Sequence, residues 1–321
     1  MTRSGALALL LAVGSIGWSL LGPASVAAAI SPQFPDQGPG NRGADVRAAQ
    51  GLLRQQGATI AVDGVFGAST VTAVRAFQAA AALPVTGRVD DGTWRRLVVR
   101  LETGSTGEAV RALQRQLNEK RGAGIVLDSV FGPTTRSAVL SFQRHMGLSP
   151  SGVVGALTWR YLLWHFERPV FGRQLCDYQV GNGPADWGTG AAIGQLEAAA
   201  TRFAAIGRGR LAVGDIGLEH GGPIAGHQSH DVGLDVDIRP IRRKADQCRS
   251  GVNWRMAAYD RTATRALVRA IRATAAGHVK VIYFNDPVLI REGLTRAYIG
   301  HDDHIHVRYC ERVHRLAAFD C

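Results

Sequence analysis

The sequence predicts a multidomain protein with two small all-α modules of three helices each, followed by an α+β domain with an antiparallel sheet. Three observations support this prediction. A segment of the N-terminal half is repeated at an offset of 64 to 65 residues. Apolar residues recur at helical spacing inside each copy. The C-terminal half contains short stretches in which apolar and polar residues alternate, as they do along β-strands.

The first residues have the pattern of a secretory signal peptide. An apolar run covers residues 6–21 after Arg3, and small residues at 25–29 offer a cleavage site. Glycine and serine interrupt the run, which favours a cleaved signal peptide over 1–29 rather than a membrane anchor. We therefore expect a secreted protein, periplasmic or associated with the cell wall, without stable membrane insertion after signal cleavage.

The composition is basic, with 37 Lys and Arg against 26 Asp and Glu and a net charge of +11. Such a charge can draw an exported protein to anionic wall polymers or to a membrane surface. The chain contains no nucleic-acid-binding motif, so we expect no nucleic-acid partner. The arginines are spread along the chain, and a compositional bias explains them as well as a functional patch does.

Residues 30–41 are rich in Pro, Gly and Gln, which predicts a linker. The two copies of the repeat follow, over 42–101 and 102–166. Each reads as three short helices with a turn motif between the first two. Four aromatic residues at matching positions fall on apolar helical faces, and we expect them in the cores: Phe77, Trp94, Phe142 and Trp159.

The copies share an Asp-Gly-x-Phe-Gly, Phe-Gln and Thr-Trp pattern, although the second has Ser129 at the first glycine. This pattern resembles the peptidoglycan-binding modules of cell-wall hydrolases. The resemblance implies peptidoglycan as a partner.

Residues 170–321 form the predicted C-terminal domain. An Ala-rich stretch at 189–206 and a basic amphipathic stretch at 262–276 predict helices, and 210–216 and 279–284 predict strands. Helices packed on an antiparallel sheet make an α+β domain.

Two further strands carry the residues of chemical interest. Along 234–238, the side chains of Asp235 and Asp237 alternate with three aliphatic residues and so share the opposite face. His304 and His306 share one face of a second alternating stretch.

If the two strands lie side by side, His230, Asp237 and His306 meet at one point. Imidazole nitrogen and carboxylate oxygen are ordinary zinc ligands, and three protein ligands plus water is the pattern of catalytic zinc sites. On residue types alone, a structural His-x-His, a hydrogen-bonded turn or a calcium site remain open.

Together the two stretches follow His-x-Ser-His-x-x-Gly-x-Asp-x-Asp and then His-x-His. This motif resembles the penicillin-insensitive murein endopeptidases, over residues 176–312. The resemblance implies a zinc peptidase, a murein endopeptidase that cuts the cross-link between D-alanine and diaminopimelate. A carboxypeptidase or an amidase with the same site is the near alternative, and a non-catalytic wall-binding protein is the other.

The resemblance supports His230, Asp237 and His306 as the metal ligands, and implies His304 as the general base. Some family members hold a second metal through an Asp-x-x-His sequence, which is absent between 238 and 300. We therefore expect a single zinc site and regard a second one as doubtful.

Three other polar residues receive supporting roles. His227 and His301 could donate to the oxyanion or hold substrate, and His227 could also contact the metal. Asp235 is expected to orient a ligand histidine rather than to bind metal.

All four cysteines lie in the C-terminal part: Cys176, Cys248, Cys310 and Cys321. An even number in an exported chain predicts two disulfides, with three pairings open. Zinc binding by cysteine is disfavoured because the chain has no Cys-x-x-Cys.

Overall fold

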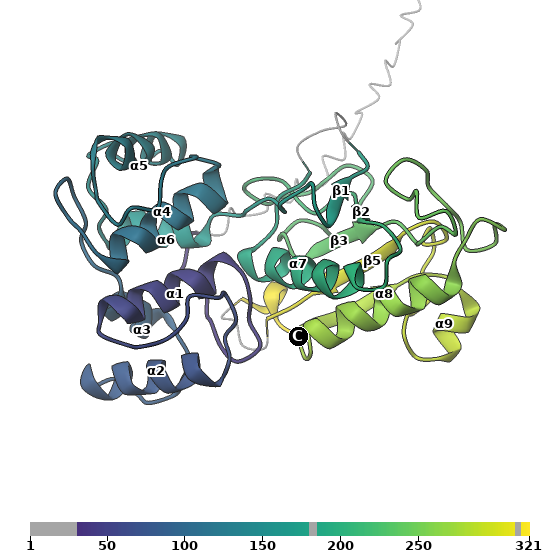
Figure 1. The fold of residues 1–321 in the computed structure, drawn as a ribbon, viewed down its shortest axis with the longest axis horizontal. Coiled ribbons are helices and arrows are strands. Elements are labelled where there is room, and N and C mark those ends of the chain that lie inside the picture. Colours follow the sequence, from purple (N-terminus) through teal and green to yellow (C-terminus); the bar gives the residue numbers. More distant parts are fainter. Residues whose placement is uncertain (1–30, 180–184, 312–315) are drawn as a thin grey trace, which may run out of the picture. The chain divides into compact units, whose positions relative to one another are not determined.

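The computed structural model describes residues 31–179, 185–311 and 316–321 (Figure 1). The predicted signal peptide over 1–29 lies outside these residues. Within them, every helix is too short or too polar to cross a bilayer.

Each repeat folds as three helices, as predicted. The helices of the first are α1 (Ala44–Gln55), α2 (Ala68–Ala80) and α3 (Asp91–Leu97). Those of the second are α4 (Glu108–Arg121), α5 (Pro133–His145) and α6 (Ala156–Trp164). One hydrophobic core runs through both repeats, so the two small modules stabilise each other.

A buried glutamine fastens the turn between the first two helices of each repeat. Gln50 Nε2 donates to Asp63 Oδ1 at 2.8 Å, and Gln114 Nε2 donates to Asp128 Oδ1 at 2.7 Å. The same glutamines accept a backbone N–H from the turn. Because every polar atom of the amide head is used, a polar side chain can sit in the core without cost.

Three of the four aromatic residues are core residues, as expected. Trp94 and Trp159 are fully buried, and Phe142 is 2% exposed. Phe77 differs, because it is only partly buried.

The predicted linker is packed against the first repeat. Phe34 is 2% exposed and stacks near Trp94, with ring centroids 6.1 Å apart. The Trp94 indole also donates to the carbonyl oxygen of Pro35 at 2.7 Å. Composition alone missed this, because one buried aromatic residue and one backbone acceptor are enough to fix a Pro- and Gly-rich segment.

The C-terminal domain is α+β, as predicted. Its described residues form a five-stranded sheet in the order β1-β2-β3-β5-β4. The strands are β1 (Leu175–Asp177), β2 (Leu211–Val213), β3 (Asp235–Ile238), β4 (Val279–Tyr283) and β5 (Ile305–Tyr309). The helices are α7 (Gly190–Ala204), α8 (Arg261–Thr274) and the short α9 (Pro287–Arg291).

The sheet is mixed and not wholly antiparallel, because the edge strand β1 pairs in parallel with β2. The reason lies in the connection: α7 crosses over between the two strands, and a crossover helix returns the chain in the same direction. The pairs β2–β3, β3–β5 and β5–β4 are antiparallel.

Helices α7 and α8 lie side by side along the sheet (Figure 1). Leu196 and Phe203 of α7 and Leu267 of α8 share one core with Val236 of β3 and Val307 of β5. This packing buries the apolar face of the two central strands and leaves their polar residues on the opposite face.

The four cysteines pair as Cys176 with Cys248 and Cys310 with Cys321. Of the three pairings that were open, the fold selects the one that ties β1 to the loop after β3 and the end of β5 to the last residue.

The repeats and the C-terminal domain pack together within one compact body over 31–321. Gly43 illustrates how close they approach: it has a φ of +103°, and a Cβ there would lie 2.1 Å from the Gly190 carbonyl oxygen. Lys120 is the central buried charge of this region. Its Nζ lies 2.8 Å from Asp45 Oδ1 and donates to the carbonyl oxygens of Leu163 and His165, each at 2.8 Å.

Replacing Lys120 with Met should destabilise the protein by about 3–5 kcal/mol, because Asp45 would stay buried without its partner. The matched control is Arg100→Met, which breaks an exposed pair with Glu102 and should cost about 0–1 kcal/mol. Urea unfolding of the two variants measures the difference. An equal loss of unfolding free energy in both variants would show that the buried pair stabilises the protein no more than the exposed pair does.

Candidate metal centre

The register between β3 and β5 assembles the polar cluster. Asp237 lies opposite His306, and Asp235 lies opposite Arg308. His230, from the loop before β3, is fully buried beside them. Both aspartates and His306 are no more than 6% exposed, although their strands bring them from positions about 70 residues apart.

The three predicted ligands converge. His306 Nδ1 lies 3.0 Å from Asp237 Oδ1 and 3.2 Å from His230 Nε2. His230 Nε2 lies 3.5 Å from the same carboxylate oxygen. These three atoms therefore surround one point.

In each ring, the nitrogen that points away from the cluster makes a hydrogen bond. That bond determines whether the nitrogen facing the cluster carries a proton or a lone pair. His230 Nδ1 donates to the Ile216 carbonyl oxygen at 3.0 Å, and His306 Nε2 donates to Asp235 Oδ1 at 3.0 Å. In the neutral rings, His230 Nε2 and His306 Nδ1 are therefore both lone-pair acceptors. Two lone pairs and a carboxylate oxygen that face one another favour a positive charge between them, either a proton on His306 or a metal ion.

Asp235 hydrogen-bonds three of its neighbours. It accepts from His306, from the backbone N–H of His230 at 3.0 Å and from Arg308 Nη1 at 2.6 Å. The contact to His230 also fixes an unusual backbone, because His230 has a φ of +76°.

His227 joins the same cluster. Its ring lies 4.4 Å from that of His230, and the ligand atoms of His227, His230 and Asp237 all lie within 4.8 Å of one another. Its Nε2 donates to Asp215 Oδ2 at 3.0 Å. The inward Nδ1, 3.9 Å from Asp237 Oδ2, is then an acceptor as well.

The electrostatics favour positive charge at this point. Burial opposes the charged form of His306, but hydrogen bonds with Asp235 and Asp237 raise its pKa to about 9. Burial raises and the two histidines lower the pKa of Asp237, and the histidines prevail. The donor set, its burial and its charge fit a zinc ion.

A cleft of about 720 Å³ opens at the cluster, lined by His227, His230 and His306 and also by His301 and His304. His304 Nδ1 donates to Asp303 Oδ1 at 3.0 Å.

The His301 ring lies 4.6 Å from that of His304 and 5.5 Å from that of His306. His301 Nδ1 donates to the Ile299 carbonyl oxygen at 3.0 Å. All the histidines named from the sequence motif therefore border one cleft.

Sequence reasoning assigned no role to several residues at the site. Asp215 lies within the range 176–312 that resembles the family, but it received no function there. Arg308 continues the alternation of His304 and His306, so its side of the strand was predictable. Tyr283 and Tyr298, which also line the cleft, had no signal in the sequence.

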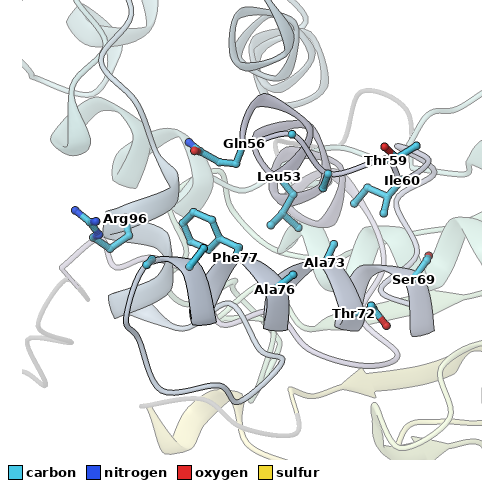
Figure 2. Close-up of a pocket in the computed structure, with 14 residues that line it drawn as sticks. Leu53, Gln56, Thr59, Ile60, Ser69, Thr72, Ala73, Ala76, Phe77 and Arg96 are labelled. Carbon is cyan, nitrogen blue, oxygen red and sulfur yellow. The ribbon is translucent and has the colours of Figure 1, made fainter.

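A second hollow, of about 820 Å³, lies on the first repeat (Figure 2). Ala73, Ala76 and Phe77 of α2 line it together with Leu53 of α1, and Arg96 lies at one end. It explains the partial exposure of Phe77.

Two family models match the chain. Residues 42–97 and 106–162 match the putative peptidoglycan-binding domain. Residues 182–276 match the penicillin-insensitive murein endopeptidase family. The matches confirm both resemblances seen in the sequence. The second ends before β5, so His304 and His306 are placed by geometry and motif alone.

Among curated proteins, an uncharacterised protein of Kitasatospora aureofaciens is 46% identical over 63 residues, or 19% of this chain and 53% of that protein. The zinc D-Ala-D-Ala carboxypeptidase of Streptomyces albus G is 43% identical over 60 residues, which are 18% of this chain and 24% of that enzyme. The chain thus spans about half and about a quarter of the length of these relatives.

A solved structure of a peptidoglycan-binding protein from Clostridioides difficile is 34% identical and covers 20% of this chain and 40% of its own. Its TM-score of 0.20 is too low to support an argument about the fold.

Replacing Asp235 with Asn should weaken zinc binding by about 10–100-fold, because His306 would lose the carboxylate that orients it. Competition against a chelator measures the affinity. The matched control is Asp231→Asn, an exposed aspartate of the loop before β3, which should leave the affinity unchanged. If both variants bind zinc as the wild type does, Asp235 does not support the centre.

Proposed function

Because two peptidoglycan-binding repeats precede a region that matches the penicillin-insensitive murein endopeptidases, we propose that the protein is a secreted zinc-dependent peptidoglycan hydrolase. It is a murein endopeptidase that cuts the cross-link between D-alanine and diaminopimelate. The observation that carries this proposal is the convergence of His230, Asp237 and His306 at one point of an open cleft.

His230, Asp237 and His306 are the proposed zinc ligands. Zinc at such a centre supplies a Lewis acid and lowers the pKa of water. The chain contributes rings already fixed in the ligating tautomer, by the Ile216 carbonyl and by Asp235, so little reorganisation is needed.

His227 is better suited to accept a hydrogen bond than to donate one. Its Nε2 proton is held by Asp215, and its Nδ1 points inward as an acceptor. We therefore place it beside the three ligands, which leave the fourth position of a tetrahedral zinc open for water. The proposal remains a single zinc site.

His304 is the proposed general base. Its Nδ1 proton is held by Asp303, so Nε2 is the nitrogen that can accept a proton from the attacking water. The same nitrogen can then pass that proton to the departing amine.

His301 and His227 are poor donors to an oxyanion in their neutral forms, because each has given its only N–H to another acceptor. Tyr283 and Arg296 line the same cleft, and their side chains carry hydrogen-bond donors. We assign oxyanion stabilisation to these two residues, and substrate holding to His301.

The repeats hold the enzyme on its substrate. We place the binding modules at 42–101 and 102–166 and the peptidase at 170–321. The groove beside Phe77 offers an aromatic ring, aliphatic side chains and Arg96, which suits a glycan with apolar sugar faces and anionic peptide stems.

A carboxypeptidase is the second candidate, since the Streptomyces albus G relative is named as one. Mass analysis of fragments released from purified peptidoglycan separates the two. Monomers released from cross-linked dimers support an endopeptidase, whereas loss of a terminal D-alanine alone supports a carboxypeptidase.

His304→Ala should keep zinc but lower turnover of soluble muropeptide dimers by about 10²–10⁴-fold, the usual share of general acid–base catalysis. His306→Ala should lose the metal as well as the activity. Metal content and cleavage are measured on the same preparations.

The reverse pattern, zinc lost in His304→Ala and kept in His306→Ala, would exchange the two roles. Full activity and full metal content in both variants would move the active site elsewhere.

Phe77→Ser should reduce the fraction of protein that sediments with insoluble peptidoglycan, while cleavage of soluble dimers stays unchanged. The control is Val126→Ser, which removes an exposed apolar residue of the second repeat, 75% exposed. Undiminished sedimentation of the Phe77 variant would exclude the groove as the wall-binding surface.

A further inference from the structure

A second group of histidines lies outside the sequence motif. His145 ends α5, His165 follows α6, and His220 belongs to the loop after β2. One ring nitrogen of each lies within 4.8 Å of the others. Both the second repeat and the C-terminal domain contribute to this group.

A carboxylate faces the same point. Glu219 Oε1 lies 3.0 Å from His145 Nε2 and 3.4 Å from His165 Nε2. Three imidazoles and one carboxylate form a complete four-ligand set for a borderline divalent cation such as zinc.

A bound ion would explain the environment of the buried His165 Nε2. It is 3% exposed, and its Nδ1 lies 2.5 Å from the Phe166 carbonyl oxygen. A carbonyl only accepts, so Nδ1 carries the proton and Nε2 carries a lone pair. That Nε2 is buried and has no hydrogen-bond partner among the residues that the structure describes.

In the neutral tautomer that donates Nδ1–H to the Phe166 carbonyl, His165 has no proton on Nε2. The neutral ring therefore presents a lone pair to a carboxylate oxygen, which is repulsive without a cation between them.

The ring spacing agrees with shared coordination. The ring centroids are 5.2 Å apart for His145 and His220, 5.5 Å for His165 and His220, and 5.8 Å for His145 and His165. Three imidazoles bound tetrahedrally at ~2.0–2.1 Å would have centroids about 5 Å apart.

We propose that His145, His165, His220 and Glu219 bind one divalent cation of the zinc class. This site is separate from the centre at His230 and does not rest on the proposed function. An ion here would fasten the second repeat to the C-terminal domain, since the ligands come from both.

Arg121 is the competing cation, because its guanidinium also pairs with Glu219. It can neutralise the carboxylate, but a guanidinium that bonds Glu219 leaves His165 Nε2 without a donor. The alternative of an ion-pair cluster without metal therefore accounts for Glu219 and not for His165.

The test is equilibrium dialysis of the chelator-treated full chain against Zn²⁺ alone. The wild type should bind about two equivalents, and His145→Ala/His220→Ala should bind about one, because two remaining ligands hold zinc poorly. His230→Ala/His306→Ala should also bind about one, and the variant with all four changes about none.

Matched variants guard against a folding defect. Arg144→Ala removes an exposed cation next to His145 and should keep both equivalents. Glu219→Gln preserves the side-chain volume and leaves three imidazoles, so it should weaken binding of the second equivalent less than the double histidine variant does. Circular dichroism checks that each variant is folded.

Two outcomes would overturn the proposal. One is a folded His145→Ala/His220→Ala variant that binds as much zinc as the wild type. The other is a wild type that binds about one equivalent, lost only with His230 and His306. Cleavage of soluble muropeptides is measured in parallel, so a failure of the second site is distinguished from a failure of the proposed hydrolase.

Discussion

The pairing register of β3 with β5 is the constraint on which the candidate centre depends. Side chains alternate along a strand, so a slip by one residue would turn Asp235 and Asp237 into the apolar core and expose Val236. The burial of Val236 and Val307 under α7 and α8 makes that slip costly. The same hydrophobic packing that stabilises the domain therefore fixes which acidic residue faces His306. The stability of the domain and the geometry of the site therefore depend on the same strand register.

The tautomer of each histidine ring at the centre is set by a hydrogen-bond acceptor at its outer nitrogen. A backbone carbonyl holds one proton of His230, Asp235 holds one of His306 and Asp215 holds one of His227. None of these acceptors donates, so each neutral ring turns a lone pair inward. One backbone carbonyl and two carboxylates on neighbouring segments thus decide which nitrogen of each ring can bind a metal. His165 follows the same rule with the Phe166 carbonyl.

Much of the architecture was predictable from local patterns. The repeat, the helix over 261–274 and the faces of β3 and β5 all follow from periodicity within a few residues. Features that depend on distant partners were not. The cysteine pairing, the packed segment before the first repeat and the parallel edge strand β1 each require knowledge of which segments meet in space. His165 had no motif because its neighbours come from three separate segments.

The two repeats carry different residues at two matching surface positions. At the repeat offsets, Ala80 of the first copy corresponds to His145 of the second, and Gly57 corresponds to Arg121. In the first copy these positions border an open groove, whereas in the second both side chains engage Glu219. Where the first copy has a solvent-facing surface, the second copy contacts Glu219 of the C-terminal domain. The two modules are therefore not interchangeable, and a chimaera with two first copies would keep its grooves but lose these contacts with the C-terminal domain.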